Sequence, residues 1–489
     1  MSESTLHAPT AEPAPSPEPD RGSETWTLRR CARTHPWWSC TAGVIVFSVA
    51  LVTWAGTRPG FDPYGWLTWG HQTLLGSLDT NAAPSWKPLP YLFTTVFALA
   101  GHQELRLWMI ASCALALAGS IFAGRIVYRL TDAPPQRRWA AWAAAVFAGL
   151  AVLGINQYFH YILSAQSDPV IVGLCLGAID CHLSDRPRAA FLLGALAGLG
   201  RPEVWPFLGL YLLWAWVRRP AMRWLMAGSV IAMLLLWFGI PALTARTWNV
   251  SAANALDSGR RLTSNQIGGT IRRFLDLSPL ALKLLALVGV ALAAWRRSRS
   301  DVVTLVLAAG VAVWVIVEIG FALHGWPGLA RYMFEAGAVM IVLAGIGVGR
   351  LLADPPRLGA IPAWGGAVVV GIAVLGLVPP AISAARVEHK DLREQRRRTA
   401  EINALPGVID RLGGAARLRA CGEPLTRLQY QTMLAYTLGD NVNQVGFKYG
   451  PSIAHGNPII LFTPYPTHIG WLVQALHQVT PACRALPRG

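Results

Sequence analysis

Charged residues are scarce in this chain. They make up 14% of the 489 residues, whereas hydrophobic residues make up 53%. So little charge cannot cover the surfaces of several water-soluble domains, and the composition therefore predicts a polytopic α-helical membrane protein. The sequence also lacks a His, Asp or Glu cluster with metal-ligand spacing, so we expect no metal and no other cofactor.

Acidic residues are fewer than basic ones. The 26 Asp and Glu residues face 42 Lys and Arg residues, which gives a formal charge of +16. Such an excess can indicate nucleic-acid binding, but most arginines fall in short runs between apolar stretches, where membrane proteins keep their cytoplasmic anchors. We therefore exclude nucleic acid as a partner and expect a multi-pass protein in the lipid bilayer of the plasma membrane.

The composition changes twice along the chain. Residues 1–28 are rich in Pro, Ser and Glu without apolar periodicity, which predicts a disordered cytoplasmic tail. Residues 29–384 contain about eleven apolar stretches, and residues 385–489 are less hydrophobic and predict a small extracytoplasmic α/β domain. The eleven stretches cover 37–57, 107–127, 139–155, 169–183, 189–200, 203–217, 224–246, 278–295, 302–322, 332–350 and 361–381.

Loop charges predict the orientation. A cytoplasmic N-terminus places five later basic loops on the cytoplasmic side as well, and it places the C-terminal domain outside. This alternation requires that the 14-residue stretch 88–101 lies in or dips into the outer leaflet as a juxtamembrane helix without crossing. If that stretch crosses, every later loop changes side. The basic segment 386–398 argues against the orientation, although its acidic residues reduce the excess.

Polar residues within or beside the predicted spans collect toward the outer face. Ionisable groups at membrane depth are costly and are usually paired or functional. Their shared location predicts one outward-facing cavity, to which eleven side chains belong: Asp62, Lys87, Arg106, His160, Asp168, Arg201, Glu203, Glu318, His324, Arg331 and Glu335.

Two outer segments contribute further candidates. The arm 189–200 reaches about 18 Å as a helix, short of a bilayer core of about 30 Å, so Arg201 and Glu203 should lie below the outer surface. They either staple two helices together or contact substrate. In the loop 247–277, Arg260 and Arg261 could hold an anionic headgroup.

Several motifs resemble those of glycosyltransferases with the GT-C fold that use lipid-phosphate sugars, especially those of actinobacterial cell envelopes. The resemblance covers roughly residues 37–381. It rests on Asp62 in the first outer loop and on four short motifs, which are "WKPLP" (86–90), "QSDP" (166–169), "GRPEVWPF" (200–207) and "GLARY" (328–332).

The resemblance implies an activity and a site. In that family an acidic residue of the first outer loop is the base for an acceptor hydroxyl that attacks a sugar carried on polyprenyl phosphate, and Asp62 matches it. Many relatives have two adjacent acids there, whereas this chain has "FDPY", so Asp79 is a second candidate. Fixed cations stabilise the departing phosphate, and the candidates are Lys87, Arg331 and either Arg260 or Arg261.

Other side chains could bind the sugar. Tyr64, Trp66, Trp69 and Trp86 could stack on sugar faces, although Trp and Tyr also populate membrane interfaces for purely physical reasons. His71 and His324 could hydrogen-bond sugar hydroxyls or phosphate.

The C-terminal domain carries two of the seven cysteines, Cys421 and Cys483. Two cysteines in an oxidising compartment tend to pair, so we expect a disulfide there. In the same domain, residues 457–465 predict a strand, while "EPLTRLQYQTMLAYTLG" and "IGWLVQALHQV" predict helices.

The sequence thus predicts a hexosyl- or pentosyltransferase for cell-wall biogenesis. Its partners would be a polyprenyl-phosphate-linked sugar donor and a glycan or glycolipid acceptor of the envelope. Two alternatives remain, which are a lipid or solute transporter and a non-catalytic envelope scaffold. Transporters tend to bind substrate near the midplane between repeated halves, and no such repeat is visible in this sequence.

Overall fold

The computed structural model describes residues 36–82, 84–256, 262–353, 364–476 and 483. The chain divides into two units, residues 1–44 and 45–489. Within the first unit only residues 36–44 are described, and they begin helix α2, Pro36–Ala55. The predicted disordered tail, residues 1–28, lies outside the described residues. All other elements belong to the second unit.

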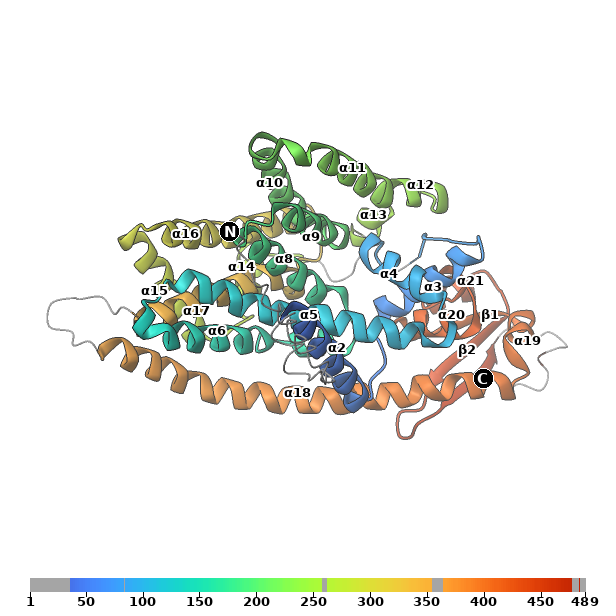
Figure 1. Cartoon of the computed structure of the whole chain (residues 1–489). Helices are drawn as coiled ribbons and strands as arrows, with labels where there is room; N and C mark the ends of the chain where they lie inside the picture. Colours follow the sequence, from blue (N-terminus) through green and yellow to red (C-terminus); the bar gives the residue numbers. More distant parts are fainter. Residues whose placement is uncertain (1–35, 83, 257–261, 354–363, 477–482, 484–489) are drawn as a thin grey trace, which may run out of the picture. The chain divides into compact units, whose positions relative to one another are not determined.

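The second unit is mostly helical (Figure 1). Its helices before the C-terminal sheet are α3 (Phe61–Leu74), α4 (Pro88–Ala98), α5 (Glu104–Thr131), α6 (Arg138–Leu153), α7 (Tyr158–Leu163), α8 (Ser167–Leu183), α9 (Pro187–Gly200), α10 (Trp205–Arg218), α11 (Arg223–Leu234), α12 (Ile240–Thr244), α13 (Val250–Leu256), α14 (Gln266–Leu275), α15 (Leu280–Arg296), α16 (Arg299–Leu323), α17 (Phe334–Ala353) and α18 (Gly365–Arg411). Short 3-10 turns join several of them, including η1 (Gly101–Gln103), η2 (Pro135–Arg137), η3 (Pro202–Val204), η4 (Pro220–Met222) and η6 (Ala330–Met333), and a π-helical segment, η5 (Leu235–Gly239), separates α11 from α12.

Six helical segments in the described part of the chain are long and apolar enough to cross a membrane: Trp37–Ala55, Gly101–Thr131, Pro220–Thr244, Arg299–Leu323, Ala330–Ala353 and Gly365–Arg411. Helices α14 and α15 pass the same test together, although they meet at an angle of 93°. Every predicted apolar stretch coincides with a helix, but α6, α8, α9 and α10 contain only 14 to 17 residues. Helices of that length fall short of a bilayer core of about 30 Å. The predicted number of eleven spans is therefore not confirmed.

Residues 88–101 contain the short helix that the sequence predicts. Helix α4 has 11 residues and begins with Pro88 at its first turn, where the missing N–H of proline is tolerated. It packs against α3, α5 and α9. Because 11 residues rise about 16 Å, α4 is too short to cross a bilayer alone. The direction in which the chain enters the membrane remains a prediction.

We expect cysteine labelling in intact cells to test this orientation. In a background without the unpaired cysteines, a cysteine at Ser264 should react with a membrane-impermeant reagent, and one at Arg299 should not. Both positions are exposed in the structure, so reactivity will report the side of the membrane. Reversed labelling would mean that residues 88–101 cross the bilayer after all.

Close helix contacts at glycine hold the centre of the bundle. A Cβ atom at Gly173 would lie 2.1 Å from the backbone oxygen of Leu115, so α8 lies directly against α5. Likewise, a Cβ atom at Gly347 would lie 2.4 Å from the backbone oxygen of Leu285, where α17 meets α15. Small residues permit such approaches of backbone to backbone in membrane bundles. Helices α8 and α17, which carry two acidic residues of the site described below, are thereby fixed in the core.

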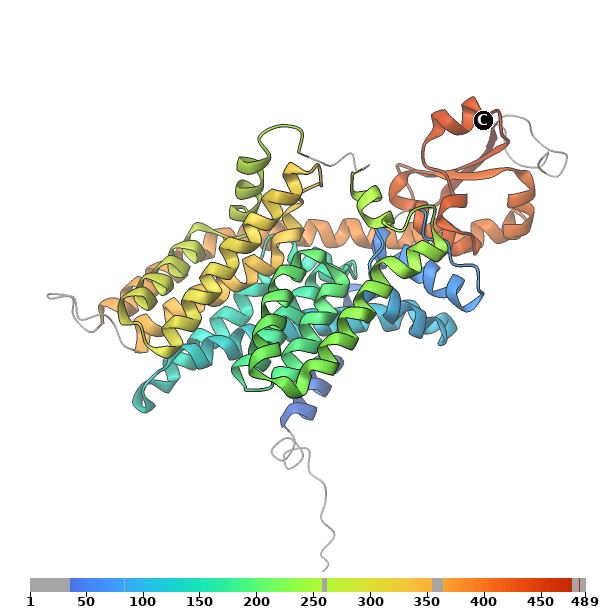
Figure 2. The same ribbon diagram turned by 90° about the horizontal axis from the view of Figure 1, so that it is seen from above.

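The C-terminal region contains a three-stranded sheet (Figure 2). Its strands are β1 (Glu423–Thr426), β2 (Ile459–Pro464) and β3 (Trp471–Leu476), in the order β1-β2-β3. Strand β1 is parallel to β2 and β3 is antiparallel to it. Around the sheet lie α19 (Gly414–Cys421), η7 (Leu428–Tyr430), α20 (Gln431–Leu438), η8 (Val442–Gln444) and α21 (Tyr449–Ala454).

Two predictions for this region were wrong in part. The segment "IGWLVQALHQV" was expected to be a helix, but its residues 471–476 form β3. Burial alternates strictly along this strand, a period of two that a helix would not give. The segment that begins at Glu423 starts as β1 and becomes helical only at α20. The predicted strand at 457–465 is present as β2.

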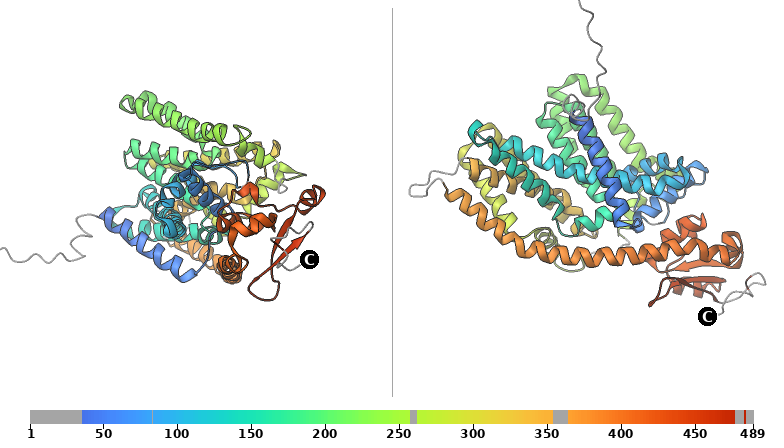
Figure 3. Two further views of the ribbon diagram at one scale, coloured as in Figure 1. Left: turned by 90° about the vertical axis from the view of Figure 1, so that its right-hand side faces the viewer. Right: turned by 60° about the horizontal axis from the view of Figure 1, so that its bottom comes forward.

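Helix α18 joins the membrane-type helices to the C-terminal sheet. It runs without a break from Gly365 to Arg411, so the predicted domain boundary at residue 385 falls inside one helix (Figure 3). The helix packs against α15 and α17 and also against α19, α20 and β3. The C-terminal region is therefore continuous with the helical bundle.

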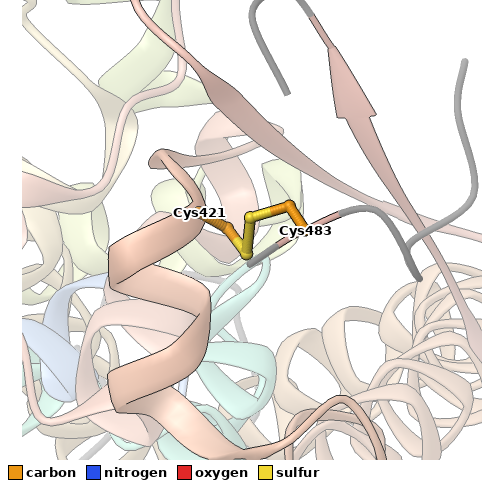
Figure 4. The surroundings of a disulfide bond; sticks show 2 residues. All are labelled: Cys421 and Cys483. Atoms are coloured by element: carbon orange, nitrogen blue, oxygen red, sulfur yellow. A yellow bond between two sulfur atoms is a disulfide. The ribbon is translucent and has the colours of Figure 1, made fainter. Parts of the chain in front are cut away.

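The disulfide that the sequence predicts is present between Cys421 and Cys483 (Figure 4). Their Cα atoms are 5.4 Å apart. Cys421 is the last residue of α19, so the bond ties the end of the chain to the helix that precedes β1.

Candidate active site

Asp62 lies in the first turn of α3, within a segment that the sequence suggested was a loop. A carboxylate in this position interacts favourably with the positive end of the helix dipole. The backbone N–H of Gly60 donates to the carbonyl of Ser164 at 2.8 Å, which fixes the start of α3 beside the start of α8. A Cβ atom at Gly60 would lie 2.6 Å from Nε2 of Gln166, so a larger residue here would displace the end of that side chain.

The C-terminal region also holds the start of α3. Thr432 of α20 donates its hydroxyl to the carbonyl of Phe61 at 2.7 Å, and Arg398 of α18 donates to the carbonyl of Pro59 at 3.1 Å. Both bonds lie within three residues before Asp62 in the sequence. The C-terminal helices therefore help to position the candidate base.

Arg331 is the cation beside Asp62. Its Nη2 lies 3.5 Å from Oδ2 of Asp62, and its Nη1 lies 3.9 Å from Oδ2 of Asp168. The guanidinium also lies 5.6 Å from the ring centres of Tyr161 and Tyr332, within range of cation–π attraction. Arg331 comes from η6, directly before α17, so its position follows from the start of that helix.

Arg201 lies at the centre of a buried group of acids. It hydrogen-bonds Asp168 and Glu203, and its Nε lies 3.6 Å from Oε1 of Glu335. The guanidinium is 4.3 Å from the ring centre of Tyr332. Its side chain is only 3% exposed. Arg201 and Glu203 thus form an ion pair, as one of the two interpretations of the sequence requires, and Asp168 and Glu335 join it.

Lys87 lies at the edge of the same group. Its Nζ donates to Oγ of Ser167 at 3.0 Å and lies 5.8 Å from the ring centre of Trp66. Burial lowers the pKa of Lys87 to about 7, with Arg201 and Arg331 lowering it as well and Asp62 and Glu203 acting in the opposite direction. A bound phosphate would favour the charged form of this lysine.

Glu318 of α16 adds a further buried acid near Arg201, Glu203 and Glu335. Both carboxyl oxygens of Glu318 and of Glu335 lack a hydrogen-bond partner among the described residues. The group, hereafter the charged cluster, contains five carboxyl groups and three cations: Asp62, Asp168, Glu203, Glu318 and Glu335 with Lys87, Arg201 and Arg331.

Exposure differs sharply within the charged cluster. The side chains of Asp62 and Arg331 are 19% and 14% exposed, whereas those of Asp168, Glu203 and Glu335 are exposed by 3% or less. Asp62 and Arg331 are therefore more accessible to solvent than these three acids. Among the described residues no group of three or more His, Cys, Asp or Glu side chains is arranged to bind a metal ion.

The aromatic residues proposed for sugar stacking are packing residues in this structure, which corrects that prediction. Tyr64, Trp66, Trp69 and Trp86 are at most 2% exposed. Trp86 donates its ring N–H to the carbonyl of Leu236 at 3.0 Å and lies 5.4 Å from Trp69 between ring centres. The ring N–H groups of Trp66 and Trp69 have no hydrogen-bond partner among the described residues. Burial of a large ring suits a core as well as a sugar site, so the presence of these residues in the sequence did not distinguish the two roles.

Two other candidates, His324 and His71, contact residues outside the charged cluster. His324 ends α16, and its Nδ1 lies 2.7 Å from the carbonyl of Gly320 in its own helix. His71 lies 2.7 Å from Oε2 of Glu104, which also accepts a hydrogen bond from Tyr436 of α20. His71 therefore belongs to a contact between α3, α5 and the C-terminal region. Arg260 and Arg261 lie outside the described residues.

We expect His71 to make stability depend on pH. Its hydrogen bond to Glu104 raises the pKa of His71 above 6.5, against the opposing effect of burial. A raised folded-state pKa stabilises the fold fully below the unfolded value and loses this contribution as pH rises through the folded value. The melting temperature should therefore fall as pH rises above about 6.5, and less so in His71→Gln. His324→Gln is the control, and identical profiles of His71→Gln and the unmodified protein would refute the assignment.

Asp79, the alternative base, has a structural role. Its carboxylate accepts bonds from the backbone and side chain of Asn81 and from the side chain of Asn443. Such a short turn stabilised by an Asp side chain is common. None of these contacts involves the charged cluster.

Comparisons with known proteins add little. No family model and no curated protein matches the chain. Four solved chains match it, among them a crystal structure of ArnT from Cupriavidus metallidurans bound to undecaprenyl phosphate. That structure shares 15% identity and a TM-score of 0.47 with this chain, covering 88% of this chain and 94% of its own. Similarity at this level establishes neither a shared fold nor a shared family.

Proposed function

We propose that this chain is an integral membrane glycosyltransferase of the GT-C type. It transfers a sugar from a polyprenyl-phosphate donor to a glycan or glycolipid acceptor at the outer face of the membrane, with Asp62 as the base. The observation that carries this proposal is the pair of Asp62 and Arg331, 3.5 Å apart at the accessible edge of the charged cluster. The sequence motifs that resemble this family contribute Asp62, Lys87, Asp168, Arg201 and Arg331 to that cluster.

The proposed reaction uses the negative charge of Asp62 and the positive charges of Arg331 and Lys87. Asp62 accepts the proton of an acceptor hydroxyl as its oxygen bonds to the anomeric carbon. The bond between that carbon and the phosphate oxygen breaks, and the polyprenyl phosphate leaves with an added negative charge. Arg331 and Lys87 stabilise this charge from fixed positions. Arg331 lies 3.5 Å from Asp62, and Lys87 belongs to the same charged cluster.

Arg201 is a positioning residue in this scheme. It contacts Asp168, which in turn lies 3.9 Å from Arg331. The exposed pair is thereby connected to a buried network whose members come from α8, η3 and α17. Preorganised groups of this kind stabilise charge without reorganising during the reaction.

Lys87→Ala and Arg331→Ala should each weaken use of the donor. Loss of a charge-assisted contact to the phosphate costs on the order of 2 kcal/mol, which appears as a lower kcat/KM for the donor. The measurement is initial rate against donor concentration, with Lys283→Ala as the control, since Lys283 bonds the carbonyl of Leu275 away from the cluster. Unchanged donor kinetics in both variants would refute the proposal that Lys87 and Arg331 contact the phosphate.

The experiment that tests the function separates transfer from transport. Purified protein in sealed vesicles is given radiolabelled polyprenyl-phosphate mannose or arabinose together with envelope acceptor extract. A transferase forms a labelled product with a new glycosidic bond, whereas a transporter moves label across the membrane in unchanged form. The bent helix pair α14 and α15 makes the transporter worth testing, because broken helices occur in transporters. If neither a labelled product nor movement of the label is found, a non-catalytic scaffold is favoured.

A further inference from the structure

A second polar feature lies where two turns of the bundle meet. An open pocket of about 600 Å³ is lined by residues 185–189, at the connection of α8 to α9, and by residues 218–222, at the connection of α10 to α11. Met222 is buried at 2% exposure, whereas the arginines around it are exposed. The pocket is therefore an open hollow bordered by charge.

The pocket is separate from the charged cluster. Helix α8 begins beside Asp168 and ends before the pocket, and its 17 residues span about 25 Å. Helix α9 runs back from the pocket to Arg201, and α10 runs from the turn that carries Glu203 to the pocket again. The two features thus occupy opposite ends of the same three helices, whichever end faces outward.

The charge of the pocket is strongly positive. Arg186, Arg188, Arg218 and Arg219 line it together with a single acid, Asp185. Arg219 pairs with Asp185 at 2.5 Å. Arg188 and Arg218 are exposed and make no ion pair or hydrogen bond with any described residue. Two guanidinium groups are therefore available to an incoming anion.

The start of α9 adds to this field. Pro187, Arg188 and Ala189 form its first turn and line the pocket. No side chain caps this helix start. The backbone N–H groups of a helix start carry partial positive charge and can bind an anion. The helix start and the arginines of the pocket thus both favour an anionic ligand.

Exposed tryptophans lie close in sequence to the pocket residues. Trp214, Trp216 and Trp224 flank the second turn, and their exposed fractions are 38%, 41% and 91%. The guanidinium of Arg223 lies 5.5 Å from the ring centre of Trp216. Exposed tryptophans with neighbouring arginines are typical of the interface between bilayer and water.

We propose that this pocket binds a phosphate group of the kind found in anionic membrane lipids. Guanidinium groups bind phosphate through paired hydrogen bonds, and two unpaired arginines line this pocket together with a helix start. Basic pockets between membrane helices bind lipid headgroups by the same chemistry. A soluble phosphate compound would present the same group, so the test distinguishes the two sources.

The test is a titration of the purified full-length protein with fluorescent phosphatidylglycerol in neutral detergent. The double variant Arg188→Gln/Arg218→Gln should bind this lipid more weakly by roughly thirtyfold, the effect expected of two arginines near a membrane surface. Fluorescent phosphatidylcholine is the lipid control. The melting temperature of the double variant should equal that of the unmodified protein, because both side chains are exposed and unpaired.

The matched control is Arg299→Gln, an exposed arginine at the start of α16 that does not line the pocket. It should bind phosphatidylglycerol as the unmodified protein does. Inorganic phosphate and glycerol 3-phosphate are added as competitors. Competition at millimolar concentration or below, lost in the double variant, would identify a soluble phosphate as the ligand, and lack of competition would identify the lipid. Equal binding by the double variant, or an equal loss in Arg299→Gln, would overturn the proposal.

Discussion

Replacing Arg201 with methionine is expected to destabilise the protein by about 3–5 kcal/mol, the usual effect of removing one partner from a buried charge network. Arg201 contacts Asp168, Glu203 and Glu335, all buried. Methionine fills a similar volume but leaves these carboxyl groups without their common cation. The change should appear as a lower melting temperature and a reduced yield of folded protein in mild detergent.

Two comparisons make this expectation specific. Arg138→Met alters an exposed arginine and should change stability by about 0.5 kcal/mol or less. Adding Asp168→Asn to Arg201→Met should recover part of the loss, because it removes one of the uncompensated charges. A melting temperature for Arg201→Met equal to that of Arg138→Met would show that the network contributes nothing to the fold.

Asp62→Asn is expected to reduce the rate of transfer by about 10²–10⁴-fold, the range that general base catalysis provides. Asparagine has the same shape but does not accept the proton. Stability should change little, because Asp62 is the accessible acid of the cluster and its ion pair with Arg331 is at the edge. The measurements are the initial rate at saturating donor and the melting temperature of each variant.

Asp79→Asn is the matched control for this prediction. Asp79 lies in the same segment, but its carboxylate is engaged by Asn81 and Asn443. Its variant should keep the normal rate. If Asp62→Asn retained that rate instead, Asp168 would be the next acid to test, since it shares Arg331 with Asp62.

The sequence predicted which residues lie together in the structure more accurately than it predicted the role of each residue. Asp62, Lys87, Arg201, Glu203 and Arg331 were assigned to one cavity because loop charges placed them at one end of the spans, and the structure brings them together. Asp168, Glu318 and Glu335 were expected in the same region but without roles. Their roles depend on which helix faces which, and sequence spacing carries no information on contacts between distant helices.

The errors have a common physical cause. The aromatic residues of the first outer segment suit both a sugar site and a core, and tertiary packing decided for the core at Trp69 and Trp86. Residues 471–476 were assigned to a helix, whereas pairing with β2 makes them a strand. The number of spans stays a prediction because apolar composition does not fix helix length, and α9 ends after 14 residues.

The C-terminal region illustrates what sequence could not supply. Thr432 and Arg398 bond the carbonyls of Phe61 and Pro59, one and three residues before Asp62, across more than 300 residues of chain. No local pattern predicts such a contact. Through this contact the C-terminal region helps to position the proposed base.

The central claim is tested most directly by the formation of a labelled glycoside from polyprenyl-phosphate sugar and acceptor by the purified protein. The account predicts that the unmodified protein and Asp79→Asn form this product with release of polyprenyl phosphate, and that Asp62→Asn, folded to the same melting temperature, forms almost none. Product formation by Asp62→Asn at the normal rate would contradict it.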